Sequence, residues 1–457
     1  MELNKSYKRI VSDKGSASTI VTIFMAVIAI LAIGALIVFC ERERPSFSLL
    51  CDVSQIGLEK EISFSVTDQK RGVRKIQIFI DQGDKHAKIY QKEFPDTDSL
   101  MHPGPGRVDE SFSIDTKALG LREGQAMLVA DIWDYSMWNW AKGNKATLTY
   151  PINIDTHPPR VNIIYSPTYI KAGGSGIVTY KVNEPTLKHG VTVNGYFHPG
   201  HLLKEEIFIA YIGIPFDTAK IEKAFVSAID QAGNTGYGAF GMIVRKIKTK
   251  RDRINISDNF LNLKLPEFLQ RYPDLQGDPI EQYLYLNEQI RRENNELLSG
   301  VCVNSALDRL WQGTFKRMAG SATRAGYPDH RTYYYKNKKI DRQVHLGIDL
   351  ASVRHAEIKA ANTGVVIFTD YAGLYGRTVI LDHGQGVFSL YSHMSRIDVV
   401  PGDAVDLKTV IGLTGNSGMA LGDHLHFSML INGIFVSPLE WWDSHWLKVN
   451  ILNPLNL

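Results

Sequence analysis

The stretch "GDHLHFSML", residues 422–430, decides the fold and the chemistry of the C-terminal part of the chain. Its short apolar run, bounded by a glycine turn, predicts a strand. Side chains alternate between the two faces of a strand, so His424 and His426 are expected on one face. Leu425 and Phe427 would then point to the other face, into a core. Two imidazoles on one face form half of a metal-ligand pattern.

The stretch "HLGIDLAS", residues 345–352, supplies the other half of the pattern. Gly347 and the β-branched Ile348 disfavour a helix between His345 and Asp349. In an extended backbone His345 and Asp349 project from one face. Two histidines and one aspartate match the three protein ligands of a catalytic zinc site, which keeps a fourth position for water or substrate.

Two further motifs lie between these stretches: "LYSHM", with His393 at a predicted strand end, and "TGNSG", a glycine-rich turn at residues 414–418. Histidines beside zinc can move protons or stabilise an oxyanion. Tyr391 is expected on the face of His393, where it either lends a hydroxyl or packs. A lone histidine in a strand is usually structural, but four motifs in this order favour a site.

The chain has 14 histidines, and those outside the pattern include four that could be mistaken for site residues. His198 and His201 in "HPGH" have no carboxylate at matching spacing, and we interpret them as loop residues. His355 and His383 lie in the C-terminal region, where we interpret them as turn or rim residues.

The order H-x-G-x-D, Y-x-H, T-G-x-S-G, H-x-H-F resembles that of the lysostaphin-type (LytM-like) zinc metallopeptidases. The flanking stretches "RTYYYKNKKIDRQVHLGIDLAS" and "SPLEWWD" are also similar to that family. The resemblance covers roughly residues 313–445. It implies a compact, antiparallel β domain with a groove that binds Zn²⁺ and cleaves the stems or cross-bridges of bacterial peptidoglycan.

The resemblance also implies roles for single residues. The family's zinc ligands correspond to His345, Asp349 and His426, and its non-ligand active-site histidines to His393 and His424. One of the latter two would take the proton of the attacking water, and the sequence does not say which. Ser428 stands where relatives often have glutamate, which puts substrate detail in doubt rather than catalysis.

Two alternatives remain open at this stage. One is a catalytically silent relative that activates another wall hydrolase, against which the complete set of five residues argues. The other is a structural surface protein, which would not need the set.

Some relatives are latent because an upstream segment covers the groove. The segment just before this domain could do the same, with Asp341, Asn337 or Asp329 as candidates to reach the metal; a regulatory partner is not identifiable.

The N-terminal stretch "TIVTIFMAVIAILAIGALIVFC", Thr19–Cys40, carries no charge. As a helix it would be about 33 Å long, enough to cross a bilayer. Because "FCERERP" follows without a small-x-small cleavage site, we predict an uncleaved membrane anchor at residues 19–40. Lys5, Lys8, Arg9 and Lys14 precede the anchor, whereas only Arg42 and Arg44 follow closely. This bias places residues 1–18 in the cytoplasm and the rest in the periplasm or outside the cell.

Alternating strand patterns such as "EISFSVTD" and "SGIVTYKVNE" predict two β-sandwich modules, at residues 45–150 and 151–250. The stretches "VADIWDYSMWN" and "VSAIDQAGN" look like a repeat of strand, Asp, turn and Asn. They resemble the late strand of bacterial immunoglobulin-like modules, except that Trp138 replaces a glycine. The whole chain is therefore expected to be mostly β.

A helical connector is predicted at residues 255–312, before the peptidase-like domain at 313–445 and a tail at 446–457. Asp278 is its expected N-cap and Pro279 its first helical residue. The connector's expected packing face consists of Ile280, Leu284, Ile290 and Leu297.

Charge and cysteine content exclude other classes of function. A net charge of +3, from 51 basic and 48 acidic residues, gives no case for nucleic acid. We interpret the one basic run, "RKIKTKRDR" at 245–253, as a solvated linker. Cys40, Cys51 and Cys302 show no zinc-finger spacing, and a Cys51–Cys302 disulfide is left open.

Overall fold

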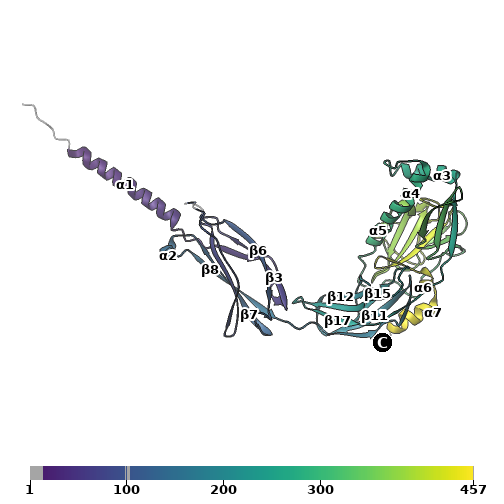
Figure 1. Cartoon of the computed structure of the whole chain (residues 1–457), viewed down its shortest axis with the longest axis horizontal. Coiled ribbons are helices and arrows are strands. Elements are labelled where there is room, and N and C mark those ends of the chain that lie inside the picture. Colours follow the sequence, from purple (N-terminus) through teal and green to yellow (C-terminus); the bar gives the residue numbers. More distant parts are fainter. Residues whose placement is uncertain (1–13, 98, 100–102, 456–457) are drawn as a thin grey trace, which may run out of the picture. The chain divides into compact units, whose positions relative to one another are not determined.

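The computed structural model describes residues 14–97, 99 and 103–455 (Figure 1). Strands take up 44% of the chain and helices 18%, which confirms a mostly β protein. The chain divides into two compact units. The first contains residues 1–157 with 231–234, and the second contains residues 158–230 with 235–457. We describe each unit by itself.

The first unit begins with the apolar helix α1 (Lys14–Phe39). Its segment Thr19–Phe39 has a mean hydropathy of 3.0 and is not buried within the structure. By length and composition this segment can cross a membrane, a test that a signal sequence also passes. Most of the predicted cytoplasmic tail, residues 1–13, lies outside the described residues.

The globular part of the first unit is a sandwich of two sheets around one core. One sheet has the order β1 (Ser46–Leu49), β3 (Glu59–Thr67), β6 (Arg107–Asp115). The other has the order β2 (Gln55–Ile56), β8 (Lys145–Ile154), β7 (Gly124–Asp134), β4 (Val73–Gln82), β5 (Lys85–Glu93). The short segment α2 (Trp138–Ala141) lies between β7 and β8. Strand β8 runs past the module boundary predicted at residue 150.

The second unit starts with another two-sheet module. Its sheets are β14 (His201–Lys204), β15 (Ile207–Gly213), β11 (Ser175–Val182), β9 (Val161–Tyr165), and β13 (Tyr196–Pro199), β12 (Thr186–Val193), β16 (Ala224–Asp230), β17 (Thr235–Ala239). β10 (Tyr169–Lys171) pairs with β18 (Ile243–Arg245). The repeat noted in the sequence corresponds to β7 and β16, which end at the buried Asp134 and Asp230. That the modules are immunoglobulin-like stays a prediction.

The basic run at 245–253 is not simply a solvated linker. Its last residues open strand β19 (Arg251–Ile256), which pairs in parallel with β21 (His330–Tyr335). β21 in turn pairs with β22 (Lys338–Val344). The linker interpretation was wrong there because parallel pairing joins segments far apart in the sequence, which a local charge pattern does not reveal.

The connector is helical, as predicted, with one difference in its packing face. It contains α3 (Asp258–Leu269), α4 (Pro279–Tyr285), the π-helical η1 (Leu286–Ile290) and α5 (Arg291–Val301). Asp278 caps α4 and Pro279 opens it, as expected. Leu297, however, is 49% exposed and Leu298 is buried. The π segment explains the shift, because it inserts an extra residue into the helical repeat.

The C-terminal domain is built on an antiparallel sheet. Its strand order is β20 (Ala322–Ala325), β23 (Ile348–Ala351), β31 (Leu425–Ile431), β27 (Val387–Met394), β26 (Arg377–Asp382), β25 (Gly364–Tyr371), β29 (Ala404–Val405), with β32 (Ile434–Val436) beside β31. A small sheet adds β24 (Glu357–Lys359), β30 (Val410–Leu413), β28 (Arg396–Ile397). The remaining elements are η2 (Gly373–Tyr375), α6 (Pro438–Trp442), α7 (Ser444–Leu447), η3 (Lys448–Leu452) and α8 (Asn453–Leu455).

The second module and the C-terminal domain share one hydrophobic core, which the sequence did not indicate. Ile177, Ile209 and Tyr211 of the module pack in the same cluster as Trp311 and Trp441. Trp441 Nε1 donates a hydrogen bond of 3.0 Å to the Ser175 hydroxyl. The two parts are therefore packed together directly rather than joined only by a flexible linker.

All three cysteines are free thiols, and Cys302 is fully buried in that shared core. The disulfide left open between Cys51 and Cys302 is not formed in this structure. Burial raises the pKa of the Cys302 thiol, so this side chain is neutral and serves in packing.

Candidate metal centre

Strand register brings the predicted ligands together. β23 and β31 are antiparallel neighbours in which Asp349 lies opposite His426. His345 lies just before β23 and reaches the same point. Leu425 and Phe427, on the other face of β31, are 1% and 2% exposed and belong to the core. The period-two prediction for this strand is therefore confirmed.

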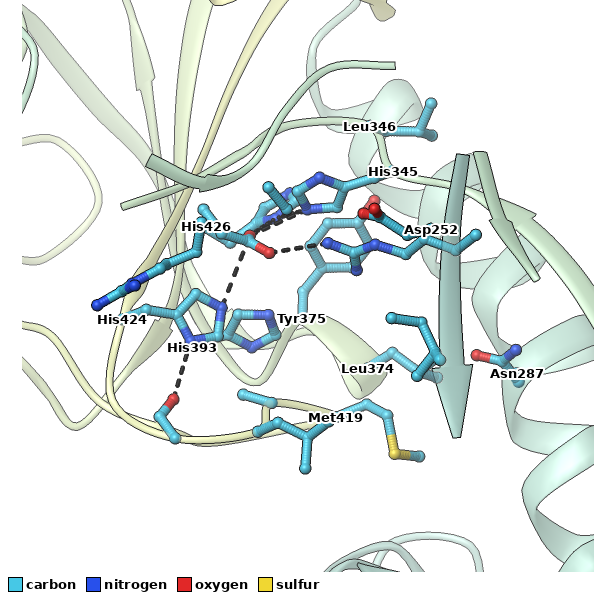
Figure 2. A pocket seen from close by; sticks show the side chains of 18 of the residues that line it. Asp252, Asn287, His345, Leu346, Leu374, Tyr375, His393, Met419, His424 and His426 are labelled. Atoms are coloured by element: carbon cyan, nitrogen blue, oxygen red, sulfur yellow. Dashed lines mark hydrogen bonds and ion pairs between the residues drawn. The ribbon is translucent and has the colours of Figure 1, made fainter. Parts of the chain in front are cut away.

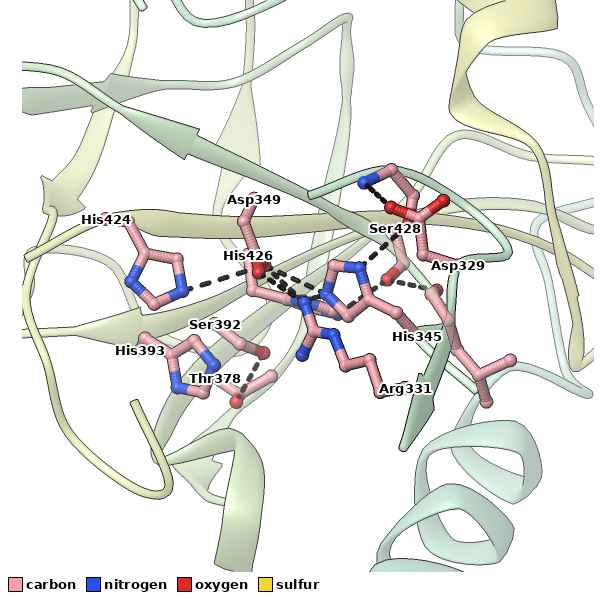
Figure 3. Close-up of polar contacts among 12 residues, drawn as sticks. Asp329, Arg331, His345, Asp349, Thr378, Ser392, His393, His424, His426 and Ser428 are labelled. Atoms are coloured by element: carbon pink, nitrogen blue, oxygen red, sulfur yellow. Dashed lines mark hydrogen bonds and ion pairs between the residues drawn. The ribbon is translucent and has the colours of Figure 1, made fainter. Parts of the chain in front are cut away.

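Three ligand atoms converge in this arrangement (Figure 3). His345 Nε2 lies 2.9 Å from Asp349 Oδ1 and 2.9 Å from His426 Nδ1. His426 Nδ1 lies 3.0 Å from the same Asp349 oxygen. All three side chains are buried, and their ligand atoms lie within 4.8 Å of one another, close enough to hold one metal ion.

Hydrogen bonds to the opposite ring nitrogens fix the tautomers of both histidines. His345 Nδ1 donates to the Gly326 carbonyl at 2.9 Å, which leaves the lone pair on Nε2. The Ser428 hydroxyl donates to the Leu346 carbonyl at 2.8 Å, so it accepts from His426 Nε2 at 3.1 Å. The lone pair of His426 is therefore on Nδ1. Neutral imidazoles oriented in this way and one carboxylate oxygen fit zinc.

Ser428 and Gly347 act together on His426. A Cβ atom at Gly347 would lie 2.5 Å from both His426 Nε2 and Ser428 Oγ, closer than real Cβ contacts come. Only glycine therefore leaves room for the imidazole and its hydroxyl partner. The glycine of H-x-G-x-D is explained by this close approach, and the serine in place of glutamate has an orienting role that the sequence did not reveal.

The second oxygen of Asp349 is held by Arg331 of β21. The Arg331 guanidinium donates to Asp349 Oδ2 at 2.9 Å (Figure 3). Burial by itself raises the pKa of Asp349, but the imidazole of His345, followed by those of His424 and His426, lowers it well below its usual value. Asp349 is thus ionised, as a metal ligand must be. Arg331 opens the flanking stretch quoted above, but the sequence did not indicate a role for it.

His393 and His424 lie beside the three ligands, as predicted, with their rings 4.9 Å apart. His393 Nδ1 donates to the Ser417 carbonyl at 2.9 Å, and His424 Nδ1 donates to the Gly422 carbonyl at 2.8 Å. Both rings therefore carry their lone pair on Nε2, and His424 Nε2 lies 3.6 Å from Asp349 Oδ1.

The environments of these two histidines shift their pKa values in opposite directions. Burial, followed by the neighbouring His424 and His426, lowers the pKa of His393 well below its usual value. Burial also lowers the pKa of His424, but the nearby Asp349 carboxylate more than offsets it, so the net shift is upward.

The connector supports the turn that orients His393. From α3, the buried Lys264 ammonium donates to the carbonyls of Asn416 and Gly418 at 2.6 and 2.8 Å. The Gly418 N–H donates to Glu267 at 3.1 Å. The carbonyl of Ser417, between these anchored residues, accepts from His393. The "TGNSG" motif is thus a positioning turn, and its support from α3 has no local signal in the sequence.

Tyr391 does not reach the site. Its hydroxyl accepts from the Ala361 N–H at 2.8 Å, and its ring packs 5.3 Å from that of Phe427 in the core. The predicted shared face was wrong because His393 adopts a φ of 62°, which interrupts the alternation at the end of β27. The packing alternative for Tyr391 is the one the structure supports.

A cavity of about 590 Å³ opens over the metal ligands, His393 and His424 (Figure 2). Its far wall comes from the connector, through Tyr283, Asn287 and Arg291, and from Asp252 and Ile254 of β19. The predicted packing helix therefore also shapes the site.

The predicted candidates for covering the metal occupy other positions. Asp341 accepts from Asn287 and Gln343. The Asp329 carboxylate accepts from the Gly326 N–H at 2.6 Å and so steadies the carbonyl that binds His345. Asn337 has a φ of 63° between β21 and β22. The ligand cluster described here comprises His345, Asp349 and His426 without any of the three. Latency itself stays a prediction.

The remaining histidines differ in part from expectation. His198 and His201 lie in strands β13 and β14 and are buried, so they are not loop residues. His383 is buried, donates to the Thr363 carbonyl and binds the Ser389 hydroxyl, so it is a structural residue rather than a rim residue. His355 is an exposed turn residue, as predicted.

Comparison with known proteins places this domain in a family. Residues 343–438 match the model of peptidase family M23, so the C-terminal domain belongs to that family. The chain is 37% identical over 98 residues to the DD-carboxypeptidase/endopeptidase Mpg of Neisseria meningitidis serogroup B (strain ATCC 13091 / M2091), which covers 21% of this chain and 23% of that protein. It is 27% identical over 164 residues to the peptidoglycan DD-endopeptidase ShyA of Vibrio cholerae, which covers 36% of this chain and 35% of that protein.

Among solved structures, the catalytic domain of lysostaphin from Staphylococcus simulans is similar to this chain at 22% identity. The match covers 29% of this chain and 98% of that domain, with a TM-score of 0.25. The two curated relatives are matched over only about a quarter to a third of their own length.

Proposed function

We propose that this chain is a membrane-anchored zinc metalloendopeptidase that hydrolyses peptide bonds in the stems or cross-links of bacterial peptidoglycan. The observation that carries the proposal is the convergence of three lone-pair atoms, on His345, Asp349 and His426, within 2.9–3.0 Å of one another. Membership of family M23 and a relative named as a peptidoglycan DD-endopeptidase support the substrate class.

A zinc ion held by these three residues would lower the pKa of a water ligand and polarise the scissile carbonyl. The chain's own residues do the remaining work. His393 and His424 each keep a proton on Nδ1, bound to a carbonyl, and an acceptor at Nε2. One of them accepts a proton at Nε2 from the attacking water and returns it to the leaving amine, and its neighbour, when it also carries a proton on Nε2, donates to the developing oxyanion.

The location follows from α1. We propose that residues 19–40 span the membrane with the N-terminus in the cytoplasm, which puts the peptidase domain in the periplasm or on the extracellular side. The apolar length of Thr19–Phe39 supports the span. A peptidase held there meets peptidoglycan without release from the membrane.

The test uses the full chain in detergent or nanodiscs with purified sacculi. We expect about one zinc per chain by elemental analysis, release of new amino groups, and hydrolysed muropeptides by mass spectrometry, which also identifies the bond. His345→Ala should lose both zinc and release. Absence of bound zinc at neutral pH, or unchanged release by His345→Ala, would overturn the proposal. Bound zinc without any release would favour the catalytically silent alternative.

A further inference from the structure

We propose that residues 137–142, here named the aromatic loop, rest in the headgroup layer of an anionic bilayer, so that the first module stands on the membrane. The loop contains α2 and joins β7 to β8. The proposal rests on α1 as a membrane anchor, and it does not depend on peptidase activity.

The aromatic loop exposes large apolar side chains. Trp140 is 94% exposed, Met137 is 52% exposed and Trp138 is 38% exposed. Such a cluster on a water-facing surface is unusual and marks an interaction site. Tryptophan has an apolar body and a polar N–H, which suits the boundary between hydrocarbon and water. The composition of the loop therefore fits a bilayer interface.

The backbone of the aromatic loop holds Trp140 outward. Asn139, Trp140 and Ala141 have consecutive φ values of 54°, 59° and 59°, the left-handed conformation that L-residues avoid. Arg74 donates to the carbonyls of Ala141 and Lys142 and fixes this turn. An unfavourable turn that is held in place and presents its tryptophan to the outside points to a role for that side chain.

The aromatic loop, which contains α2, lies beside the C-terminal end of α1 (Figure 1), and hydrogen bonds join the two segments. The Met137 N–H donates to the Phe39 carbonyl at 2.7 Å, and the Ser136 hydroxyl donates to the Glu41 carbonyl at 2.7 Å. The span Thr19–Phe39 has 21 residues. At the usual helical rise these cover about 31 Å, close to the thickness of the hydrocarbon core. Phe39 therefore falls at the membrane surface, and the loop bonded to it falls at the same level.

The charges around the loop favour anionic lipid as the partner. The Arg42 guanidinium lies 3.8 Å from the centre of the Trp138 ring. Arg44, which follows α1, and Lys142, which ends the aromatic loop, are both exposed. The carboxylate of Glu43 is paired with the Lys70 ammonium at 2.6 Å. Basic residues next to a membrane anchor are attracted to anionic headgroups. The aromatic side chains of the loop thus suit the boundary between hydrocarbon and headgroups, and the basic side chains beside them suit anionic headgroups.

Tryptophan quenching by brominated lipid tests the proposal, because α1 contains no tryptophan. The full chain is placed in nanodiscs that contain phosphatidylglycerol and brominated phosphatidylcholine. We expect part of the emission to be quenched, and we expect Trp138→Ser/Trp140→Ser to lose that quenched part. Trp446→Phe, in the other unit, is the control and should keep it. Nanodiscs without phosphatidylglycerol should quench less.

The outcomes separate this proposal from the anchor on which it rests. Co-elution of the chain with nanodiscs reports the anchor. A chain that co-elutes but shows no quenching, or equal quenching in the double variant, would overturn membrane docking of the loop. Acrylamide quenching of Trp140 to the same degree in nanodiscs and in detergent would also overturn it, and would leave the surface to a protein partner.

Discussion

Two pairs of histidines in the second unit look alike in sequence and differ in chemistry. His424 and His426 are two residues apart in the C-terminal domain, and His198 and His201 are three apart in the second module. His426 has a partner for each ring nitrogen. In the described part of the chain, His198 Nε2 and both ring nitrogens of His201 have no hydrogen-bond partner. What makes a metal site is the set of acceptors that aim the lone pairs, more than the histidines themselves.

Burial alone does not distinguish the two pairs. It lowers the pKa of His198 to about 3. It also lowers the pKa of His426 to about 4, with Asp349 acting in the opposite direction. Both histidines are neutral near pH 7 for the same reason, desolvation. Of these residues, only His426, with a carboxylate beside it and a fixed tautomer, is placed to help hold a cation.

The largest expected effect concerns the candidate metal site, to which His426 belongs. His345→Ala should remove zinc and lower kcat/KM on sacculi by about 10³-fold or more, since the metal would supply both the nucleophile and carbonyl polarisation. His201→Ala is the matched control and should keep zinc and turnover per folded molecule. Elemental analysis and amino-group release measure both. Equal loss in the two variants would contradict the distinction.

The next effect separates ligands from the histidines beside them. His393→Ala and His424→Ala should each lower kcat by roughly 10²–10⁴-fold, the usual range for general acid–base groups. Zinc content should stay at the level of the unaltered chain, because neither residue belongs to the ligand cluster. Loss of zinc in either variant would make that residue a ligand and refute the assignment.

A smaller effect tests the hydroxyl that aims His426. Ser428→Ala removes the acceptor of the His426 Nε2 proton, so zinc affinity should fall by about 10–100-fold, as for other groups that orient metal ligands. Competition with a chelator measures the affinity. Ser428→Thr keeps a hydroxyl and should retain most of it. If alanine and threonine behave alike, the hydroxyl does not set the tautomer.

The smallest effect concerns the histidine without a metal. The folded-state pKa of His198 is about 3, below the value of about 6.5 expected in the unfolded chain. The unfolded state therefore binds more protons as pH falls below about 6.5, and stability drops by up to about 1.4 kcal/mol per pH unit. His198→Gln should lose less stability than the unaltered chain between pH 7 and pH 5 in urea unfolding. An identical loss would mean that His198 is already protonated when folded.

The sequence pointed to the five residues because His345 with Asp349, and His424 with His426, form short local patterns, and because the order of the motifs resembles that of a known family. Period-two alternation places His424 and His426 on one face, and the same argument places His345 and Asp349. The prediction from periodicity failed where a local change in backbone geometry interrupted the repeat. The positive φ of His393 places Tyr391 on a different face, and after the π segment η1 it is Leu298 rather than Leu297 that is buried.

The amino-acid sequence alone indicated which residues carry candidate ligand atoms, which strands they lie on, and the apolar length of the N-terminal helix. Only the folded chain shows which nitrogen of each histidine is available. The groups that decide it are the carbonyls of Gly326 and Ser417 and the hydroxyl of Ser428. Every residue has a backbone carbonyl, so the sequence does not indicate which carbonyl accepts a hydrogen bond from a given histidine. The three-dimensional structure is needed to identify it.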